Sequence, residues 1–473
     1  MVSIEILGQI SGYGGETFTW TAIMVLTFLV PYALIFAETG STFSDEGGNY
    51  IWVKKAFGRG VATVSTLFYW ITTPVWIGGS MAFLAAETWS RYLSPIEHGS
   101  VAGFSFNLAF IWITVLSAIV SLKISKWLPS AGAIAKVALL ALFLITTIVY
   151  AMQNGVHGIG LADLTPTLAG LLGVAPLLLF GFLGFEAANG AAGEMKNPKR
   201  DVPFALARSS VVAALCYLLP ILAILVVLPA SEITGIGGLM EAVGTVFAVY
   251  GAGGEFMLKL AAVLFVFVLV TQGAAWMIVS DRVQAIAAAD GAFFSGFLGV
   301  FSAKLGTPIR INTLSGIVAS VFMIASTLLV DGESGAIFGV VLTISISTYL
   351  ISYLAVIPAA IKLRGMYRDQ MRPYRVPVSD KVFKVIGSLC VAWVAMGSWV
   401  AVFPGTLEAV FGLEYDFLAI WGVTQLNYEL FTIGTLVVLI VVAALAYRSA
   451  RRLREESVPV IADVDDSAEP ALR

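Results

Sequence analysis

Charged residues are scarce in this chain. They make up 12% of its 473 residues, whereas hydrophobic residues make up 59% and the mean hydropathy is +0.91. A soluble globular domain carries roughly 25% charged residues. A soluble core could not enclose this much apolar surface, so the composition excludes an ordinary water-soluble protein. It indicates a protein that uses the lipid bilayer as its solvent.

Cysteine and histidine are nearly absent, with two residues of each. Cys216 and Cys390 are too few for a disulfide framework or a CxxC metal site, and we expect both to pack inside apolar runs. His98 and His157 lie in polar connectors away from acidic or cysteine clusters, so we expect no metal site. HExxH, GxSxG and Walker motifs are missing, and so is a repeated pore-lining filter. We therefore expect neither an enzyme with catalytic residues and a cofactor nor a channel, and no nucleic-acid partner.

Apolar runs long enough to cross a bilayer recur along the chain. A span needs about 20 apolar residues, and continuous rather than alternating runs favour helices, which pair their own backbone groups in lipid. The predicted helices cover residues 18–37, 60–86, 104–122, 129–152, 168–195, 203–228, 255–289, 311–330, 334–361, 383–403 and 428–447. The fragment before residue 16 is part of one further helix. We therefore expect about eleven complete spans and a piece of a twelfth.

The placement of Lys and Arg predicts the orientation. If the 38–60 connector is cytoplasmic and the sides then alternate, most of the 27 basic residues fall on the inner side, and the outer connectors are acidic. The positive-inside rule then predicts a multi-pass protein of the cell membrane with a cytoplasmic C-terminus. The tail 448–473 lacks apolar periodicity, so we expect a short helix end followed by disorder.

The predicted helix 168–195 contains clustered glycines and a carboxylate. They are Gly181, Gly184, Glu186, Gly190 and Gly193. Each interior glycine costs about 1 kcal/mol of helix propensity, and a carboxylate in mid-membrane costs about 2.5–3.5 kcal/mol on insertion scales. Together they predict an unwound segment that faces a polar cavity. Close helix packing through small residues is the alternative, although it leaves Glu186 unexplained.

The start of the chain repeats this pattern more weakly. A short, marginally apolar stretch holds Glu5, Gly8, Gly12, Gly14 and Gly15. Glycine-interrupted segments in corresponding places of two halves are typical of inverted-repeat transporters. We predict one transmembrane domain over 1–447, with repeats at about 1–152 and 168–361 and two additional helices within 383–447.

Three motifs resemble the amino acid–polyamine–organocation (APC) superfamily. GFEAANGAAGEMKNPKRDVP is similar to its sixth-helix signature. AETGSTFSDEGGNYIWVKKAFG is similar to its connector between the second and third helices, and AAWMIVSDRVQAIAAADGAFF to its eighth helix. The motifs occur in the family's order and cover nearly the whole chain, so the match is specific.

The resemblance implies an all-α, LeuT-like fold of two inverted five-helix repeats plus two helices, which works by alternating access. The substrate would lie between breaks at Ser3–Gly8 and Phe180–Glu186. The implied substrate-binding residues are Ser3, Ile4, Glu5, Gly8, Thr72, Thr73, Phe180, Gly181, Phe182, Leu183, Gly184 and Trp276. The entering half of the first helix is missing from this match, so we expect the native protein to begin roughly 15–30 residues earlier.

Proton coupling is assigned to Lys136 and Glu186. Lys136 matches a lysine on the fifth helix of proton-coupled relatives, where a buried amine could bind and release a proton. The alternative is a lysine that extends to the cytoplasmic interface. Glu186 could stabilise the break, carry a proton or attract a cation.

The sequence thus predicts a secondary transporter, embedded in membrane lipid, that moves an amino acid across the cell membrane together with protons. A carrier of polyamines or other organic amines is the alternative, and Glu5 and Glu186 keep it open. The oligomeric state is not predicted.

Overall fold

In the computed structural model, the regular elements of the described residues are all helices, in agreement with the prediction. The structure describes residues 2–45, 47–121, 127–157, 159–186, 197–234, 236–329 and 334–456. The first half contains η1 (Ile4–Ile6), α1 (Leu7–Ser11), α2 (Glu16–Met24), η2 (Val25–Leu29), α3 (Val30–Thr42), α4 (Gly48–Phe57), α5 (Arg59–Trp76), η3 (Ile77–Met81), α6 (Ala82–Tyr92), α7 (Val101–Ser121) and α8 (Trp127–Asn154).

The second half begins with a short apolar helix and continues with longer ones. Its principal helices are α9 (Leu168–Phe182), α10 (Pro198–Val227), α11 (Gly238–Val246), α12 (Gly254–Ala289), α13 (Ile309–Leu329), α14 (Ser334–Met366), α15 (Asp380–Val402), α16 (Thr406–Val410), α17 (Phe417–Trp421), α18 (Gln425–Ser449) and α19 (Arg451–Glu456). The predicted disorder over 457–473 lies outside the described residues.

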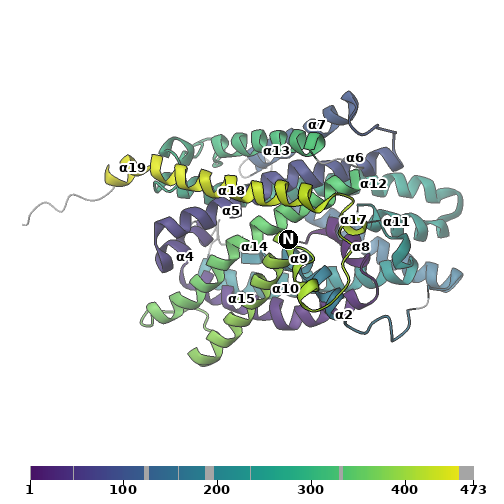
Figure 1. Cartoon of the computed structure of the whole chain (residues 1–473), viewed down its shortest axis with the longest axis horizontal. Helices are drawn as coiled ribbons and strands as arrows, with labels where there is room; N and C mark the ends of the chain where they lie inside the picture. The colour runs from purple at the N-terminus through teal and green to yellow at the C-terminus, as the bar shows by residue number, and fades with distance from the viewer. Residues whose placement is uncertain are drawn as a thin grey trace, which may run out of the picture.

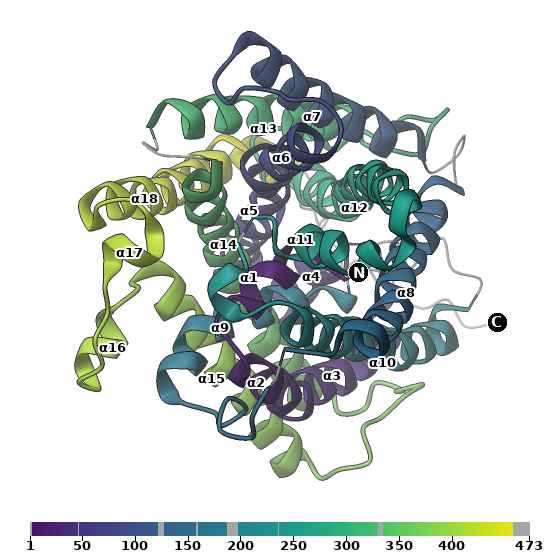
Figure 2. The ribbon, with the colours of Figure 1, turned by 90° about the vertical axis from the view of Figure 1, so that its right-hand side faces the viewer.

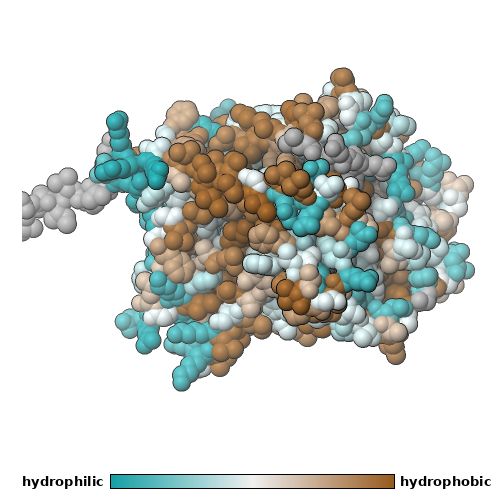
Figure 3. Space-filling model, viewed as in Figure 1, coloured by the Kyte–Doolittle hydropathy of each residue, from teal (hydrophilic) through white to brown (hydrophobic). Residues whose placement is uncertain are grey.

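Ten helical segments among the described residues are long and apolar enough to cross a membrane, and α9 is a shorter apolar helix. Many large apolar side chains on them are exposed, for example Leu26 at 71%, Ile134 at 70% and Leu328 at 70%. Figure 3 shows hydrophobic surface along much of the molecule, with hydrophilic residues gathered toward the two ends of its long axis. Exposed apolar surface on this scale suits contact with lipid rather than water.

Several predicted boundaries are wrong by more than a turn. The helix expected at 18–37 extends from Glu16 to Thr42 because η2, a π-helical turn, joins α2 to α3 without a break. The helix expected at 168–195 ends at Phe182. The helix before Ala289 is preceded by α11 and a kinked 3-10 segment, Phe247–Gly253, which the hydropathy of the run does not mark.

The short first helix lies at the centre of the bundle. In the end-on view of Figure 2, α1 lies near the middle, with the labels of α9, α11 and α14 around it. Helix α1 packs against α9, α10 and α11, while α14 packs against α5 and α15, and α12 against α7 and α8. Many of the long helices run roughly along the long axis of the molecule (Figure 1), and they surround α1 in the view of Figure 2. This arrangement brings Gly8 of the first glycine-rich segment and Gly181 and Gly184 of the second into the interior.

Candidate functional site

The sixth-helix motif departs from helical geometry at Leu183 and Gly184. Helix α9 ends at Phe182, Leu183 is extended with ψ 158°, and Gly184 has φ +94°. An L-residue rarely adopts this φ, so the left-handed turn requires glycine. The predicted break is confirmed at these two residues, which are buried. It is wrong at Phe180–Phe182, which are helical because a glycine such as Gly181 is tolerated inside a packed helix.

The first predicted break, Ser3–Gly8, is also placed wrongly. Only Ser3 is non-helical, with ψ 89°, and it is followed by η1 and α1. The change from 3-10 to α geometry occurs between Ile6 and Leu7, and the helix ends after Ser11, where the glycine run begins. Gly8 is needed for packing, since a Cβ there would lie 3.0 Å from the backbone of Gly238 on α11.

Tyr217 on α10 joins the two interrupted segments. The backbone N–H of Ser3 donates to its hydroxyl oxygen at 2.9 Å, and the hydroxyl donates to the carbonyl of Gly181 at 3.1 Å. Tyr217 is fully buried and its ring packs edge-on against Phe182 at 5.4 Å. One side chain thus satisfies a backbone donor of the first segment and a backbone acceptor of the sixth helix.

Lys136 points into the protein, which contradicts the interpretation that it extends to the interface. Its ammonium group donates to the carbonyl of Val2 and to the side-chain oxygen of Gln272. Gln272 in turn donates to Glu5 at 2.7 Å. The other oxygen of Glu5 is buried and has no hydrogen-bond partner within the described chain. The side-chain amide of Gln272 therefore bonds both to the ammonium group of Lys136 and to the carboxyl group of Glu5, next to the start of the first helical segment.

Glu186 follows directly after the sixth-helix break and is 1% exposed. The hydroxyls of Tyr32 on α3 and Tyr353 on α14 donate to its two oxygens, and Asn49 on α4 donates at 3.3 Å. Gly184 N–H donates to the Tyr32 hydroxyl oxygen at 3.1 Å. The carboxylate thus holds three helices around the break.

Aromatic rings surround the break on its other side. Trp276 packs edge-on against Trp76 at 6.4 Å and against Tyr349 at 5.7 Å, and Phe180 contacts both Trp76 and Tyr349. The indole N–H groups of Trp76 and Trp276 are buried and find no acceptor in the described part of the chain. The cluster therefore offers apolar faces together with two free hydrogen-bond donors.

The remaining predicted residues lie close to this region, with differing contacts. Thr72 bonds to the carbonyl of its own helix and to Thr348 at 2.9 Å, next to Tyr349. Thr73 is buried beside it. Ile4, with Glu5 and Gly8, lines a cavity of about 10 Å³, which is roughly the space of one water.

Sequence reasoning missed a buried carboxylate on α12. Asp281 accepts hydrogen bonds from Trp70 at 2.9 Å, Ser315 at 2.7 Å and Asn312 at 2.6 Å. It thereby ties α12 to α5 and α13. Three other buried residues of the site were also not predicted from the sequence: Gln272, Tyr217 and Tyr353. A polar residue inside the apolar run VLVTQGAAWM was the available signal for Gln272, because burial of an amide needs partners.

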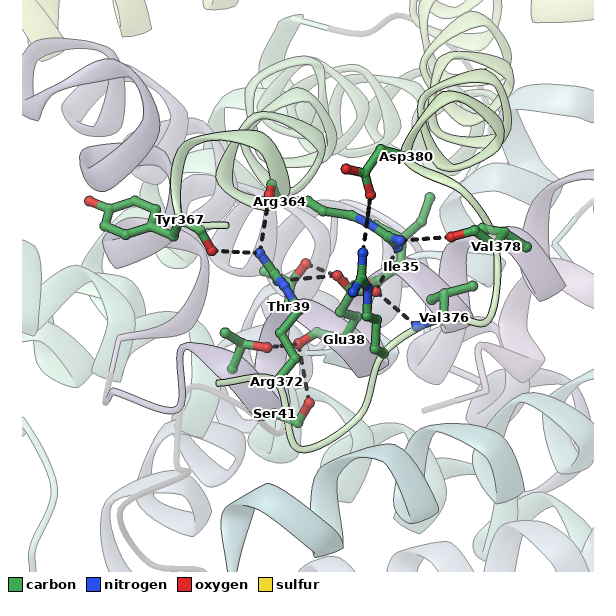
Figure 4. A network of polar contacts seen from close by, with 12 residues as sticks. Ile35, Glu38, Thr39, Ser41, Arg364, Tyr367, Arg372, Val376, Val378 and Asp380 are labelled. Carbon is green, nitrogen blue, oxygen red and sulfur yellow. Dashed lines mark hydrogen bonds and ion pairs between the residues drawn. The ribbon is translucent and has the colours of Figure 1, made fainter. Parts of the chain in front are cut away.

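Glu38 anchors the connector between α14 and α15 at the end of the molecule rich in Lys and Arg. It pairs with Arg364 at 2.8 Å and Arg372 at 3.1 Å, and it accepts the N–H of Val376 at 2.9 Å (Figure 4). The side chains of Glu38 and Arg364 are 1% and 4% exposed. The sequence predicts that Glu38 and Glu46 fix the inner connector at 38–60 rather than bind substrate. Glu38 has a structural role of this kind but holds the connector after α14, and Glu46 lies outside the described residues.

Replacing Glu38 with glutamine is expected to lower the free energy of unfolding by about 3–5 kcal/mol, because Arg372 loses its carboxylate partner and the buried Arg364 keeps only the half-exposed Asp380. Thermal unfolding in detergent measures this change. Glu255→Gln is the matched control, since Glu255 pairs with Lys259 on the surface and its loss leaves the melting temperature unchanged. Equal melting temperatures for the wild type, Glu38→Gln and Glu255→Gln would contradict the stabilising role of Glu38.

A second ion cluster lies at the same end, around Asp290. Lys54 contacts it at 2.6 Å and Arg59 at 3.0 Å, and the Tyr50 hydroxyl also donates to it. Burial alone would raise the pKa of Asp290, but these hydrogen bonds outweigh it and hold the pKa below its usual range. The cluster joins α4 and the start of α5 to the end of α12.

A cavity of about 1250 Å³ opens at the opposite end, and we call it the vestibule. Helices α1, α9 and α14 and the connector between α15 and α18 form its walls. It reaches Leu177, about one helical turn before Phe180. Ion clusters thus tie one end of the helix bundle together, while an open cavity reaches toward the break from the other.

The comparisons with known proteins agree with this architecture. Residues 1–394 match the amino acid permease family. A probable agmatine/putrescine antiporter of Lactococcus lactis is 31% identical over 398 residues, which cover 81% of each chain. An uncharacterized transporter of Legionella pneumophila is 28% identical over 79% of this chain and 81% of its own length.

A more distant relative comes from an animal. The b(0,+)-type amino acid transporter 1 of Mus musculus is 24% identical over 396 residues, covering 81% of this chain and 76% of the relative. Within the described residues no group of three or more His, Cys, Asp or Glu side chains could hold a metal ion. The family match covers most of the chain together with its helical fold, and the chain therefore belongs to the amino acid permease family of the APC superfamily and is a transporter.

Proposed function

We propose that this transporter carries an amino acid by alternating access, together with protons. The observation that supports this best is a set of three polar groups near the breaks that have no hydrogen-bond partner among the described residues. Glu5 has a buried oxygen without a donor, and the indoles of Trp76 and Trp276 have buried N–H groups without an acceptor in the described chain. Gln272, which holds Glu5, and Trp276 are one turn apart on α12 and so lie on the same face. An ammonium and a carboxylate on one small molecule complement this set.

Buried polar groups that lack partners are costly, typically about 1–3 kcal/mol each. A ligand that pairs with them recovers this free energy, which gives the site affinity for a zwitterion. The ring faces of Phe180, Trp276 and Tyr349 then cover the aliphatic part of the substrate. The left-handed turn at Gly184 keeps the break open beside these rings.

The proposed path runs from the vestibule past Leu177 to the rings around the break, and then to the Lys- and Arg-rich end. The Glu38 and Asp290 clusters would have to separate for release on that side. Lys136 and Glu186 are the proposed proton carriers, because Lys136 donates to the Val2 carbonyl at the start of the first segment and Glu186 directly follows the break after α9.

An organic amine such as agmatine is the second candidate. It is favoured by the 31% identity to a probable agmatine/putrescine antiporter and by the two carboxylates, Glu5 and Glu186, near the breaks. A substrate without a carboxylate would leave both indole N–H groups unpaired. The two candidates therefore differ in what they require of Trp276.

The variant Trp276→Phe separates them. It keeps an aromatic ring but removes the indole N–H donor. KM for amino acid uptake into proteoliposomes is therefore expected to rise about tenfold, the effect of losing one hydrogen bond to a charged group. Agmatine uptake keeps its KM. Trp127→Phe, at a side chain that is 64% exposed, is the control. Uptake of agmatine alone, unaffected by Trp276→Phe, would replace the amino acid with the amine as substrate.

A further inference from the structure

The vestibule is lined by more acidic than basic side chains. Its carboxylates belong to Glu16, Glu87, Glu408 and Glu414, whereas Arg91 contributes a guanidinium group. Arg91 is already paired with Glu241 at 2.5 Å. Glu16 accepts hydrogen bonds from the backbone and hydroxyl of Thr167 at 2.8 Å each. The excess negative charge of the vestibule therefore lies chiefly on Glu87, Glu408 and Glu414.

Glu408 differs from these acids in its burial. It lies on α16, in the connector between the two helices that follow the predicted repeats, and it is 5% exposed. Its Oε2 atom is buried and has no hydrogen-bond partner within the described residues, and no cationic side chain in that part of the chain forms an ion pair with it. A buried carboxylate oxygen without a partner is unfavourable, and a positively charged group placed beside it relieves this.

The surroundings of Glu408 suit an organic cation. Tyr13, Tyr415 and Trp421 line the same cavity and present aromatic rings, which attract ammonium and guanidinium groups. Trp421 donates to the Tyr415 hydroxyl at 2.7 Å, which fixes both rings. Burial raises the pKa of Tyr415, the hydrogen bond from Trp421 opposes this, and the nearby Tyr13 and Glu408 raise the pKa further.

The position of this cluster is remote from the breaks. Figure 2 views the molecule from the vestibule end, with α16 and α17 at the rim of the bundle. Leu177 and Ile346, which also line the cavity, lie deeper along α9 and α14. A ligand held at Glu408 would therefore occupy the entrance rather than the site at the break.

We propose that the vestibule contains a second binding site, in which Glu408 and the rings of Tyr13, Tyr415 and Trp421 hold a small organic cation with an ammonium or guanidinium group. This inference rests on the proposed function for the identity of the cation as substrate, and it adds a preference for cationic over neutral substrates. Cations gathered at the entrance raise the local substrate concentration, as charged clefts do.

Binding of radiolabelled agmatine to the purified protein tests the site directly. Equilibrium dialysis of the wild type at low salt is expected to retain one more equivalent per chain than Glu408→Gln. Glu232→Gln, an exposed acid that does not line the vestibule, is expected to behave as the wild type. Glutamine is isosteric and removes an unpaired buried charge, so the melting temperature of Glu408→Gln is expected to stay at or above that of the wild type.

Uptake separates this inference from the proposed function. Glu408→Gln is expected to raise KM for arginine or agmatine about tenfold, as the loss of one charge-assisted hydrogen bond does, and to leave leucine uptake unchanged. A protein that binds the extra equivalent but transports nothing would refute the proposed function alone. Equal equivalents in wild type and Glu408→Gln would overturn the second site, as would complete displacement of agmatine by sodium at the same concentration.

Discussion

Lys136→Ala is expected to abolish pH-driven accumulation of substrate. The ammonium group of Lys136 joins α8 to the Val2 carbonyl and to Gln272, so its removal takes away both a titratable group and a link to the first segment. With one proton per substrate, a gradient of one pH unit supports about tenfold accumulation, since each unit corresponds to about 1.4 kcal/mol. With the variant, the substrate is expected to reach equal concentrations on the two sides of the membrane.

The measurement compares uptake into proteoliposomes with and without a pH gradient. Counterflow exchange, which is driven by preloaded unlabelled substrate and needs no pH gradient, serves as the check that the variant still folds and binds substrate. Lys259→Ala removes an exposed lysine from the other end of the bundle and is expected to accumulate substrate as the wild type does. Full accumulation by Lys136→Ala would remove Lys136 from the proton mechanism.

Gly184→Ala is expected to eliminate transport and to destabilise the protein. A Cβ at Gly184 would overlap the ring of Trp276 and the hydroxyl of Tyr349. Overpacking costs about 1–3 kcal/mol, and the left-handed backbone at φ +94° adds about 1–2 kcal/mol for a residue other than glycine. Both effects act at the break itself, so loss of uptake is expected to exceed what the lower stability explains.

The matched control is Gly434→Ala on α18, where no atom lies within 4 Å of the added Cβ. Alanine is favoured in a helix by up to about 1 kcal/mol, so this variant is expected to be at least as stable as the wild type. Melting temperature and initial uptake rate are measured for both. Wild-type uptake by Gly184→Ala would show that the geometry at Gly184 is dispensable.

The long helices could be predicted from the sequence, because about 20 consecutive apolar residues have few alternatives to a transmembrane helix. The turn at Gly184 was also accessible, since clustered glycines beside a glutamate conflict with a helix that faces lipid. Its starting point was not, because Gly181 remains helical when Tyr217 and Ile6 pack against it. The position of a break therefore depends on neighbours that the local sequence does not reveal.

Contacts between distant segments were the least predictable part of the site. Tyr217 lies 214 residues from Ser3, and Gln272 lies 136 residues from Lys136. Nothing in either local run marks a tyrosine as the bridge between two backbones. The short helices α4 and α11 were missed for a related reason, because their lengths of 10 and 9 residues are below that of a membrane span.

The environment of Glu186 has a consequence for how a proton could drive movement. Its carboxylate accepts from side chains that belong to three separate helices, α3, α4 and α14. A protonated carboxyl can accept fewer hydrogen bonds than an ionised one and must itself find an acceptor. Loading a single hydrogen ion would thus take an acceptor position from one of these side chains and turn the carboxyl into a donor, so that a change of one charge weakens the tie between the break and a neighbouring helix.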